Sequence, residues 1–365
     1  MSIFSNINFF RDYEPPFDYK DFLWAGILGF VVGDAAGLPF DGMRREELAN
    51  LQNKIPELIG YKQHFQPPGT WSDNSALLFA TMQSLYDYNL VLNPDALMQN
   101  YCSWKESCKF TAAGKHLNPP ASVLDSCELY GQGKAATLCG MNHNHIDDCG
   151  NFSRVFPLAF LPVSEDKMYS AAVMISGLTD AKDQQVLLAC LYLAVARRLM
   201  LGECDKHWAV QEAIDTLRTK YLFTSLNPVL DSLKDPVKAA RHGEFDGTSA
   251  LTLIASLAAF ISSKNYENTV LCVIKLGGNT SMSAALAGGL AGIYYGVQNI
   301  PKRWTNALAN RDWVYKKNCE LCYHCLNTGG VNLGKSIDYC RKTFAWTQHR
   351  IRLAVVEERE VRAAG

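Results

Sequence analysis

The stretch LGGNTSMSAALAGGLAG (residues 276–292) decides the fold of this chain. A polar knot, residues 279–281, follows a Gly-Gly turn and precedes a helix crowded with small residues. Gly288, Gly292 and Gly296 fall at near-helical spacing on one face. Glycine inside a helix costs roughly 1 kcal/mol relative to alanine, so this stripe indicates close approach by another helix. The knot then lies at a helix N-terminus, where free N–H groups favour anions such as phosphate.

A second apolar run supplies a matching face near the start of the chain. The pattern predicts a helix over Asp21–Val32, with Gly26, Gly29 and Gly33 on one side. The two glycine faces are therefore expected to meet.

Three further polar blocks accompany these helices. They are GDAAGLPFDG (33–42), GTWSDNS (69–75) and GNFSRVFP (150–157). Ser72 is placed to cap a helix that runs to about Tyr88. Strand signals are almost absent, so the sequence predicts an all-α protein.

These blocks, in this order, resemble the ADP-ribosylglycohydrolase family, also called the dinitrogenase-reductase-activating glycohydrolase family. The closing Y-G-x-x-x-I-P pattern of that family is matched by residues 295–301, and the resemblance covers roughly residues 20–305. It implies a single-domain orthogonal helical bundle over residues 20–350. Residues 1–19 are expected to form an irregular arm and residues 351–365 an acidic C-terminal tail.

The composition of the chain bears on its ligands and its cellular compartment. The chain has 365 residues, 48% of them hydrophobic, a net charge of −1 and a pI near 6.7, so no basic excess points to nucleic acid. The 12 cysteines lack the regular spacing of a disulfide scaffold, which favours reduced thiols and a cytoplasmic location. The longest apolar run, 283–297, is too short and too rich in glycine for a membrane span. Residues 357–360 (EERE) resemble the glutamate-rich signal of bacterial effectors exported by type IV secretion, although such a cluster is usually a solvated helix face.

The family resemblance also implies a metal site, from which this chain departs. Family members hold two Mg²⁺ ions with carboxylates of a T-D-D block and a D-T-D-T block. Here the first block reads Ser72-Asp73-Asn74 and the second reads Asn279-Thr280-Ser281-Met282, which leaves Asp73 alone. Mg²⁺ prefers anionic oxygen ligands. We therefore expect no metal-binding residues and no cofactor, or at most one weakly bound Mg²⁺; a plainer reading is that these polar residues only cap helices.

Two carboxylates remain as catalytic candidates. Asp41 occupies the motif position of the family's glutamate, and Asp73 lies in the second block. Cleavage of an N-glycosidic bond to ribose passes through an oxocarbenium-like state. A carboxylate can stabilise that cation, act as a nucleophile or activate a water. The alternative for Asp41 is a turn residue before Gly42. Asp34 is expected to fix its loop through backbone hydrogen bonds.

The resemblance places ADP-ribose against several polar residues and backbone N–H groups. Phe152 fits either a stacking role against a base or ribose or a position in the core. The full set of expected substrate-binding residues is Ser72, Asn74, Asp148, Gly150, Asn151, Phe152, Ser153, Gly277, Gly278, Asn279 and Ser281.

Two other clusters invite a metal interpretation that we do not favour. His143-x-His145 is expected in a surface loop. Cys319, Cys322 and Cys325 lack the fourth cysteine of the ferredoxin pattern, and cysteines at this spacing on a helix are commonly buried as small hydrophobic residues.

The sequence thus predicts an enzyme that removes ADP-ribose from a modified protein side chain, with arginine as the expected attachment residue, and that works without a dinuclear magnesium centre. Its partners would be ADP-ribose and the ADP-ribosylated protein, with no nucleic acid and no membrane span. The alternative is a catalytically eroded module that binds ADP-ribose or a partner, such as an immunity protein that blocks an ADP-ribosyltransferase.

Overall fold

The computed structural model describes residues 19–49, 57–140, 147–202, 205–220, 227–242 and 245–327. Within these ranges the chain forms helices and no strand, so the predicted all-α class is confirmed. The predicted N-terminal arm and acidic tail lie outside the described residues, except that Tyr19 already begins the first helix.

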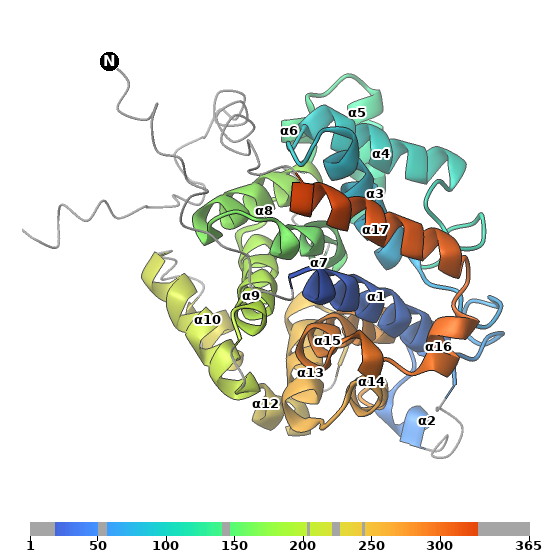
Figure 1. The fold of residues 1–365 in the computed structure, drawn as a ribbon, viewed down its shortest axis with the longest axis vertical. Helices are drawn as coiled ribbons and strands as arrows, with labels where there is room; N and C mark the ends of the chain where they lie inside the picture. The colour runs from blue at the N-terminus through green and yellow to red at the C-terminus, as the bar shows by residue number, and fades with distance from the viewer. Residues whose placement is uncertain are drawn as a thin grey trace, which may run out of the picture.

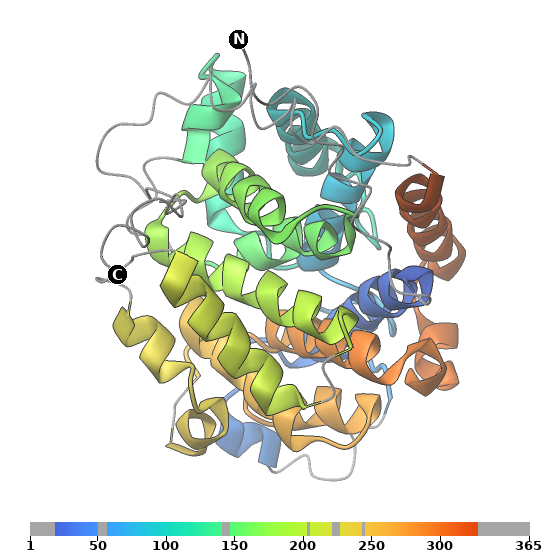
Figure 2. The same ribbon diagram turned by 60° about the vertical axis from the view of Figure 1, so that its left-hand side comes forward.

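Figures 1 and 2 show the helices of the described ranges. The longer ones are α1 (Tyr19–Gly37), α3 (Asp73–Asp87), α4 (Pro94–Ser107), α5 (Ala121–Gly131), α8 (Glu165–Thr179), α9 (Asp183–Met200), α10 (Lys206–Lys220), α13 (Ser249–Ser262), α14 (Tyr266–Ile274), α15 (Thr280–Tyr295) and α17 (Arg311–Asn327). The shorter ones are η1 (Leu38–Phe40), α2 (Arg45–Ala49), α6 (Ala136–Cys139), α7 (Gly150–Val155), η3 (Phe156–Phe160), α11 (Asn227–Ser232), α12 (Pro236–His242), η5 (Val297–Asn299) and α16 (Lys302–Ala307).

Helices α1 and α15 form the centre of the fold and pack backbone against backbone. A Cβ atom added to Gly33 would overlap the carbonyl oxygen of Ala284, and one added to Gly292 would overlap that of Ala25. Gly29 and Gly288 oppose each other in the same way. The predicted meeting of two glycine-faced helices is therefore confirmed, and Figure 1 shows the pair between α17 above and α13 and α14 below.

Helix α1 is longer than the sequence pattern predicted. It continues past Val32 to Gly37, because α15 accompanies it to the end. A Cβ on Gly37 would overlap the Thr280 carbonyl, and the Thr280 hydroxyl donates a hydrogen bond of 2.8 Å to the Gly37 carbonyl. The extra turn brings the end of α1 to the start of α15, where the polar blocks lie.

The same helix is long and apolar enough to cross a membrane by length and composition alone. The window Asp21–Phe40 has a mean hydropathy of 1.5, but 89% of it is buried inside the protein. Such burial is what a core helix shows, since its neighbours cover it on all sides.

Candidate functional site

Asp41 follows η1 and turns its carboxylate to the start of α15. Its Oδ1 accepts hydrogen bonds of 2.6 Å from the Ser281 backbone N–H and 3.3 Å from the Thr280 hydroxyl. Its Oδ2 accepts one of 3.1 Å from the Asn118 side chain and lies 3.4 Å from Nε2 of His64. The free N–H groups and the dipole of α15 favour a negative charge at this position. Asp41 is 9% exposed, so its carboxylate is held at the edge of the protein interior.

Two glycines lock the loop that carries Asp41 to the loop before α15. Gly42 N–H donates to the Gly278 carbonyl at 2.9 Å, and Gly278 N–H donates to the Met43 carbonyl at 3.0 Å. Gly277 and Gly278 have φ angles of 81° and 76°, which side chains other than hydrogen rarely tolerate. Both predicted substrate-binding glycines thus have a structural reason to be glycine in this position.

Three neutral side chains meet beside Asp41. The Asn74 amide donates to the Ser281 hydroxyl at 3.1 Å, and that hydroxyl donates to Asn279 Oδ1 at 3.3 Å. Asn279 also caps α15 by accepting a hydrogen bond of 3.2 Å from the Met282 N–H. The structure therefore brings together three of the predicted substrate-binding residues, and one of them, Asn279, also stabilises a helix start.

Asp73 has partners of its own, distinct from those of Asp41. Its Oδ1 accepts from Trp104 Nε1 at 2.6 Å and lies 3.0 Å from His116 Nδ1, while its Oδ2 accepts from the Leu117 N–H at 2.5 Å. None of its side chain is exposed. Burial raises its pKa, and the contact with His116 opposes that shift. The pairing of Asp73 with Asp41 around one ribose atom stays a prediction. In the structure Asp73 holds the loop at 116–118 through the Leu117 N–H, and Asn118 of the same loop donates to Asp41.

Ser72 joins α3 to the end of α1. It caps α3 by accepting a hydrogen bond of 3.1 Å from the Asn74 N–H, as predicted. Its own hydroxyl donates to Asp34 Oδ1 at 2.7 Å, and Ser75 donates to Asp34 Oδ2 at 2.6 Å. Asp34 also accepts from both backbone N–H groups and is fully buried. The expected backbone hydrogen bonds are present, but Asp34 lies inside α1 rather than in a loop, and the bonds fix the start of α3.

Burial raises the pKa of Asp34 from 3.8 to about 7, although the four hydrogen bonds from Ser72 and Ser75 act to lower it. The folded protein therefore binds the Asp34 proton more tightly than the unfolded chain does. The contribution to stability is fully present below about pH 4 and is lost as pH rises to about 7. The free energy of unfolding should fall by about 2.5 kcal/mol between about pH 5 and 7.5 from this group. Denaturant unfolding of the wild type and of Asp34→Asn at several pH values checks this. An unchanged slope in the variant would assign the pH dependence to other groups.

Asp148 serves as a link between two helix starts. Its Oδ2 accepts a hydrogen bond of 2.8 Å from the Ser122 N–H, and its Oδ1 accepts 3.0 Å and 3.1 Å bonds from the Ser122 hydroxyl and the Gly150 N–H. The block at 150 reaches the start of α15 through Gly247, whose carbonyl accepts a hydrogen bond from Cys149 and whose Cα faces Asn279. Substrate contact by Asp148 and Gly150 stays a prediction.

The rest of the 150–154 block lies in the interior. Phe152 is 1% exposed and contacts Tyr192 edge to face, with ring centroids 6.1 Å apart. Of the two roles expected for it, stacking on a ligand or packing in the core, the structure shows the second. The Ser153 hydroxyl donates a hydrogen bond of 3.0 Å to the Gly150 carbonyl. Asn151 donates to the Asp180 carbonyl at 3.0 Å and accepts from Arg154 at 2.5 Å. The side chains of this block are thus buried and bonded within the protein, and their contact with a ligand stays a prediction.

Four residues near the two carboxylates escaped the sequence reasoning: His64, Trp104, His116 and Asn118. They lie 23 to 77 positions from the aspartates in loops or on another helix face, and no spacing pattern connects them. The Asn-Pro-Pro turn at 118–120 was the only local signal, and it indicates a turn without indicating its partner.

The donor set does not suit two Mg²⁺ ions. Among the described residues, no three His, Cys, Asp or Glu side chains gather where they could hold a metal ion. Asp73 already accepts hydrogen bonds from three donors, and the positions where the family's two blocks carry the other carboxylates hold neutral residues here. Cys319 is exposed while Cys325 is buried, so the cysteines of α17 diverge. His143 and His145 lie outside the described residues.

Comparisons with known proteins agree on the relatives of this chain. A model of the ADP-ribosylglycohydrolase family matches residues 16–328. A protein described as "ADP-ribosylarginine hydrolase Tri1" from Pseudomonas putida (strain GB-1) is 24% identical over 311 residues, covering 81% of this chain and 76% of the relative. Another of that description, from Serratia proteamaculans (strain 568), is 18% identical over 297 residues, covering 81% and 78%. A solved structure described as "ADP-ribosylglycohydrolase-related protein complex" has a TM-score of 0.68 at 22% identity, covering 84% of this chain and 99% of that one, and it shows the likeness of fold.

Proposed function

This chain belongs to the ADP-ribosylglycohydrolase family, and from that premise we propose that it hydrolyses the bond between ADP-ribose and a modified arginine side chain of a protein. The family predicted from five sequence blocks is confirmed, and an ADP-ribosyl hydrolase follows from it. The names of two relatives favour arginine as the attachment residue. The observation that carries the proposal is the Asp41 carboxylate, held at the start of α15 beside a row of neutral hydrogen-bonding side chains.

In the proposed reaction Asp41 acts at C1 of the ribose. The C1–N bond of the protonated guanidinium group breaks, and a neutral guanidine leaves with the electron pair, while the oxygen of a water molecule forms the new C1–O bond. The guanidine then takes up the proton that the water gives to Asp41, which restores the arginine guanidinium and the Asp41 carboxylate. Asp41 takes the proton of that water and stabilises the positive charge that develops on the ribose. Asn74, Ser281 and Asn279 hold the ribose hydroxyls by neutral hydrogen bonds. Ser72 and Asp73 position this row, Asp73 by fixing the loop that carries Asn118.

The proposed enzyme works without a dinuclear magnesium centre. Two Mg²⁺ ions a few ångströms apart repel each other and need several carboxylates between them. The carboxylates at the motif positions are Asp34, Asp41 and Asp73. Asp34 is fully buried and bonded to Ser72 and Ser75, and Asp73 is enclosed by Trp104, His116 and Leu117. At most one weakly held ion is compatible with this set.

We expect chelation to leave the reaction nearly unchanged. Release of ADP-ribose from an arginine-ADP-ribosylated protein should proceed at the same rate, within about twofold, with and without EDTA. A chelator-treated family member that carries all four motif carboxylates serves as the positive control. Loss of activity in EDTA and recovery with Mg²⁺ would overturn the metal-independent mechanism while leaving the hydrolase assignment in place.

The second candidate is a binding module without turnover. It is favoured by one observation, the structural use of Asp73. Calorimetry with ADP-ribose and the hydrolysis assay together separate the cases, since a module binds ADP-ribose and releases none from the protein. An immunity protein that blocks a transferase would instead inhibit that enzyme without hydrolysing its product.

A cytoplasmic site of action is part of the proposal. The ten cysteines of the described residues are all free thiols, which supports a reducing compartment. Export by type IV secretion into a host cell is proposed from the glutamates at 357–360, which lie outside the described residues.

A further inference from the structure

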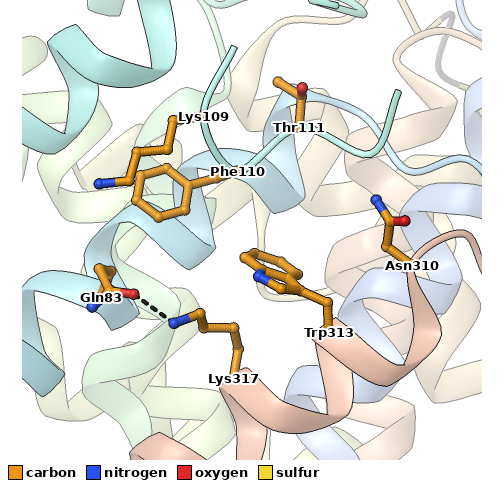
Figure 3. Close-up of a pocket in the computed structure, with 7 residues that line it drawn as sticks. All are labelled: Gln83, Lys109, Phe110, Thr111, Asn310, Trp313 and Lys317. Atoms are coloured by element: carbon orange, nitrogen blue, oxygen red, sulfur yellow. Dashed lines mark hydrogen bonds between the residues drawn. The ribbon is translucent and has the colours of Figure 1, made fainter. Parts of the chain in front are cut away.

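A groove lies on the surface where α3, the loop after α4 and α17 meet. Two cavities of about 460 Å³ and 470 Å³ adjoin there and share Asn310 and Trp313. We call their combined surface the Trp313 groove. Its first half is lined by Lys109, Phe110 and Lys317, as Figure 3 shows, and its second half by Arg311. None of these residues takes part in the site around Asp41.

The Trp313 groove has a rigid aromatic floor. Trp313 stacks on Trp71 with centroids 6.1 Å apart, and the edge of Phe79 meets it at 4.8 Å. Phe110, which is 7% exposed, forms the opposite wall and has a φ of 71°. A bulky residue in this backbone region is strained, and such strain persists only where the surroundings enforce it. The floor and wall are therefore formed before any partner arrives.

Hydrogen bonds hold the two sides of the groove together. Asn310 donates to the Ala112 carbonyl at 3.0 Å, which ties the start of α17 to the loop after α4. Lys317 donates to Gln83 Oε1 at 2.6 Å across the bottom of the groove (Figure 3). These contacts fix the spacing between the cations on the two sides.

Positive charge exceeds negative charge in the Trp313 groove. Lys317 is paired with Glu320 at 2.7 Å, and Arg311 with Asp312 at 3.2 Å. Lys109 is exposed and has no ion pair within the described part of the chain; its ammonium lies 4.8 Å from the centroid of the Phe110 ring. The chain as a whole has a net charge of −1, so this excess is local. A carboxylate placed at Lys109 would find a cation without an anionic competitor.

We propose that the Trp313 groove binds an acidic segment of the ADP-ribosylated protein, an inference that rests on the proposed function and narrows its substrates. Two adjoining cavities that share Trp313 fit an extended chain, with an apolar side chain against Trp313 and a carboxylate at Lys109. The loop that carries Lys109 also carries Asn118 of the site. Lys109 and Asn118 are nine positions apart, and nine residues of extended chain span at most about 30 Å. One substrate protein can therefore contact both the Trp313 groove and the site around Asp41.

The test compares two charge reversals. Lys109→Glu changes the groove, and Lys302→Glu makes the same change at an exposed lysine of α16 outside it. Binding of a fluorescent peptide with several Asp or Glu residues around one aromatic residue is followed by anisotropy. Lys109→Glu should weaken binding about tenfold and Lys302→Glu should leave it unchanged. Binding should also weaken as salt rises from about 50 to about 300 mM.

Hydrolysis gives the second readout. With an ADP-ribosylated peptide that carries the acidic flank, Lys109→Glu should raise KM and leave kcat unchanged. With free ADP-ribosylarginine the two variants and the wild type should be equal. Equal peptide affinity in both variants would overturn the proposal, and so would a groove that binds inorganic phosphate or a nucleotide but no acidic peptide. Failure to hydrolyse either substrate, with peptide binding intact, would overturn the proposed function alone.

Discussion

Asp41→Asn should lower kcat for release of ADP-ribose by about 10²–10⁴-fold, the range typical for loss of a general base. The amide keeps the shape of the side chain and can still accept the hydrogen bond from the Ser281 N–H, but it has no charge and takes no proton. The fold should remain, with a change in thermal unfolding of no more than a few degrees. Steady-state kinetics and circular dichroism on the same preparation measure both effects.

Asp73→Asn is the control variant, because it changes the second carboxylate in the same way and separates a catalytic role from a structural one. An amide replaces one acceptor oxygen with a donor, so one of the three buried donors around Asp73 loses its partner. An unsatisfied buried group costs about 1–3 kcal/mol, which should appear in the free energy of unfolding. Wild-type kcat in Asp41→Asn would refute the role of Asp41. An unchanged stability with kcat lowered as far as in Asp41→Asn would instead make Asp73 a catalytic partner.

The second large effect concerns the central helix pair. Gly33→Ala places a Cβ where the Ala284 carbonyl oxygen lies, and neither helix can move aside without breaking the other close contacts at Gly29 and Gly292. We expect it to lower the free energy of unfolding by more than about 4 kcal/mol, or to prevent folding.

Gly131→Ala is the matched control, since it makes the same chemical change in a helix. A Cβ at Gly131 has no neighbour within 4 Å, so the substitution should be neutral or stabilising by up to about 1 kcal/mol. Chemical denaturation of both variants, followed by circular dichroism, gives the comparison. If Gly33→Ala is as stable as Gly131→Ala, the backbone contact between α1 and α15 is not as close as described.

Local sequence patterns predicted the central pair and the helix caps, because glycine stripes and capping residues act on their own neighbours. Ser72 and Asn279 cap the helices that their positions indicate. The direction of the Asp73 side chain is different, because Trp104 and His116 capture it from 31 and 43 positions away. A motif shows that a carboxylate is present, whereas the more distant chain determines which side it faces. For the same reason the position of His64 beside Asp41 and the end of α1 at Gly37 could not be predicted, since both depend on contacts with distant parts of the chain.

The pairing of α1 with α15 has a consequence for how this protein is made. The hydrogen bond from Thr280 to Gly37 joins residues 243 positions apart. At a synthesis rate of about 5–20 residues per second, α1 leaves the ribosome roughly 12–50 s before its partner exists. During that interval one of the most apolar segments of the chain has no complementary face, and pairing over such distances is slow to form. The yield of folded protein in a cell should therefore depend on chaperones that hold the early helix, and slower translation before α15 should favour aggregation.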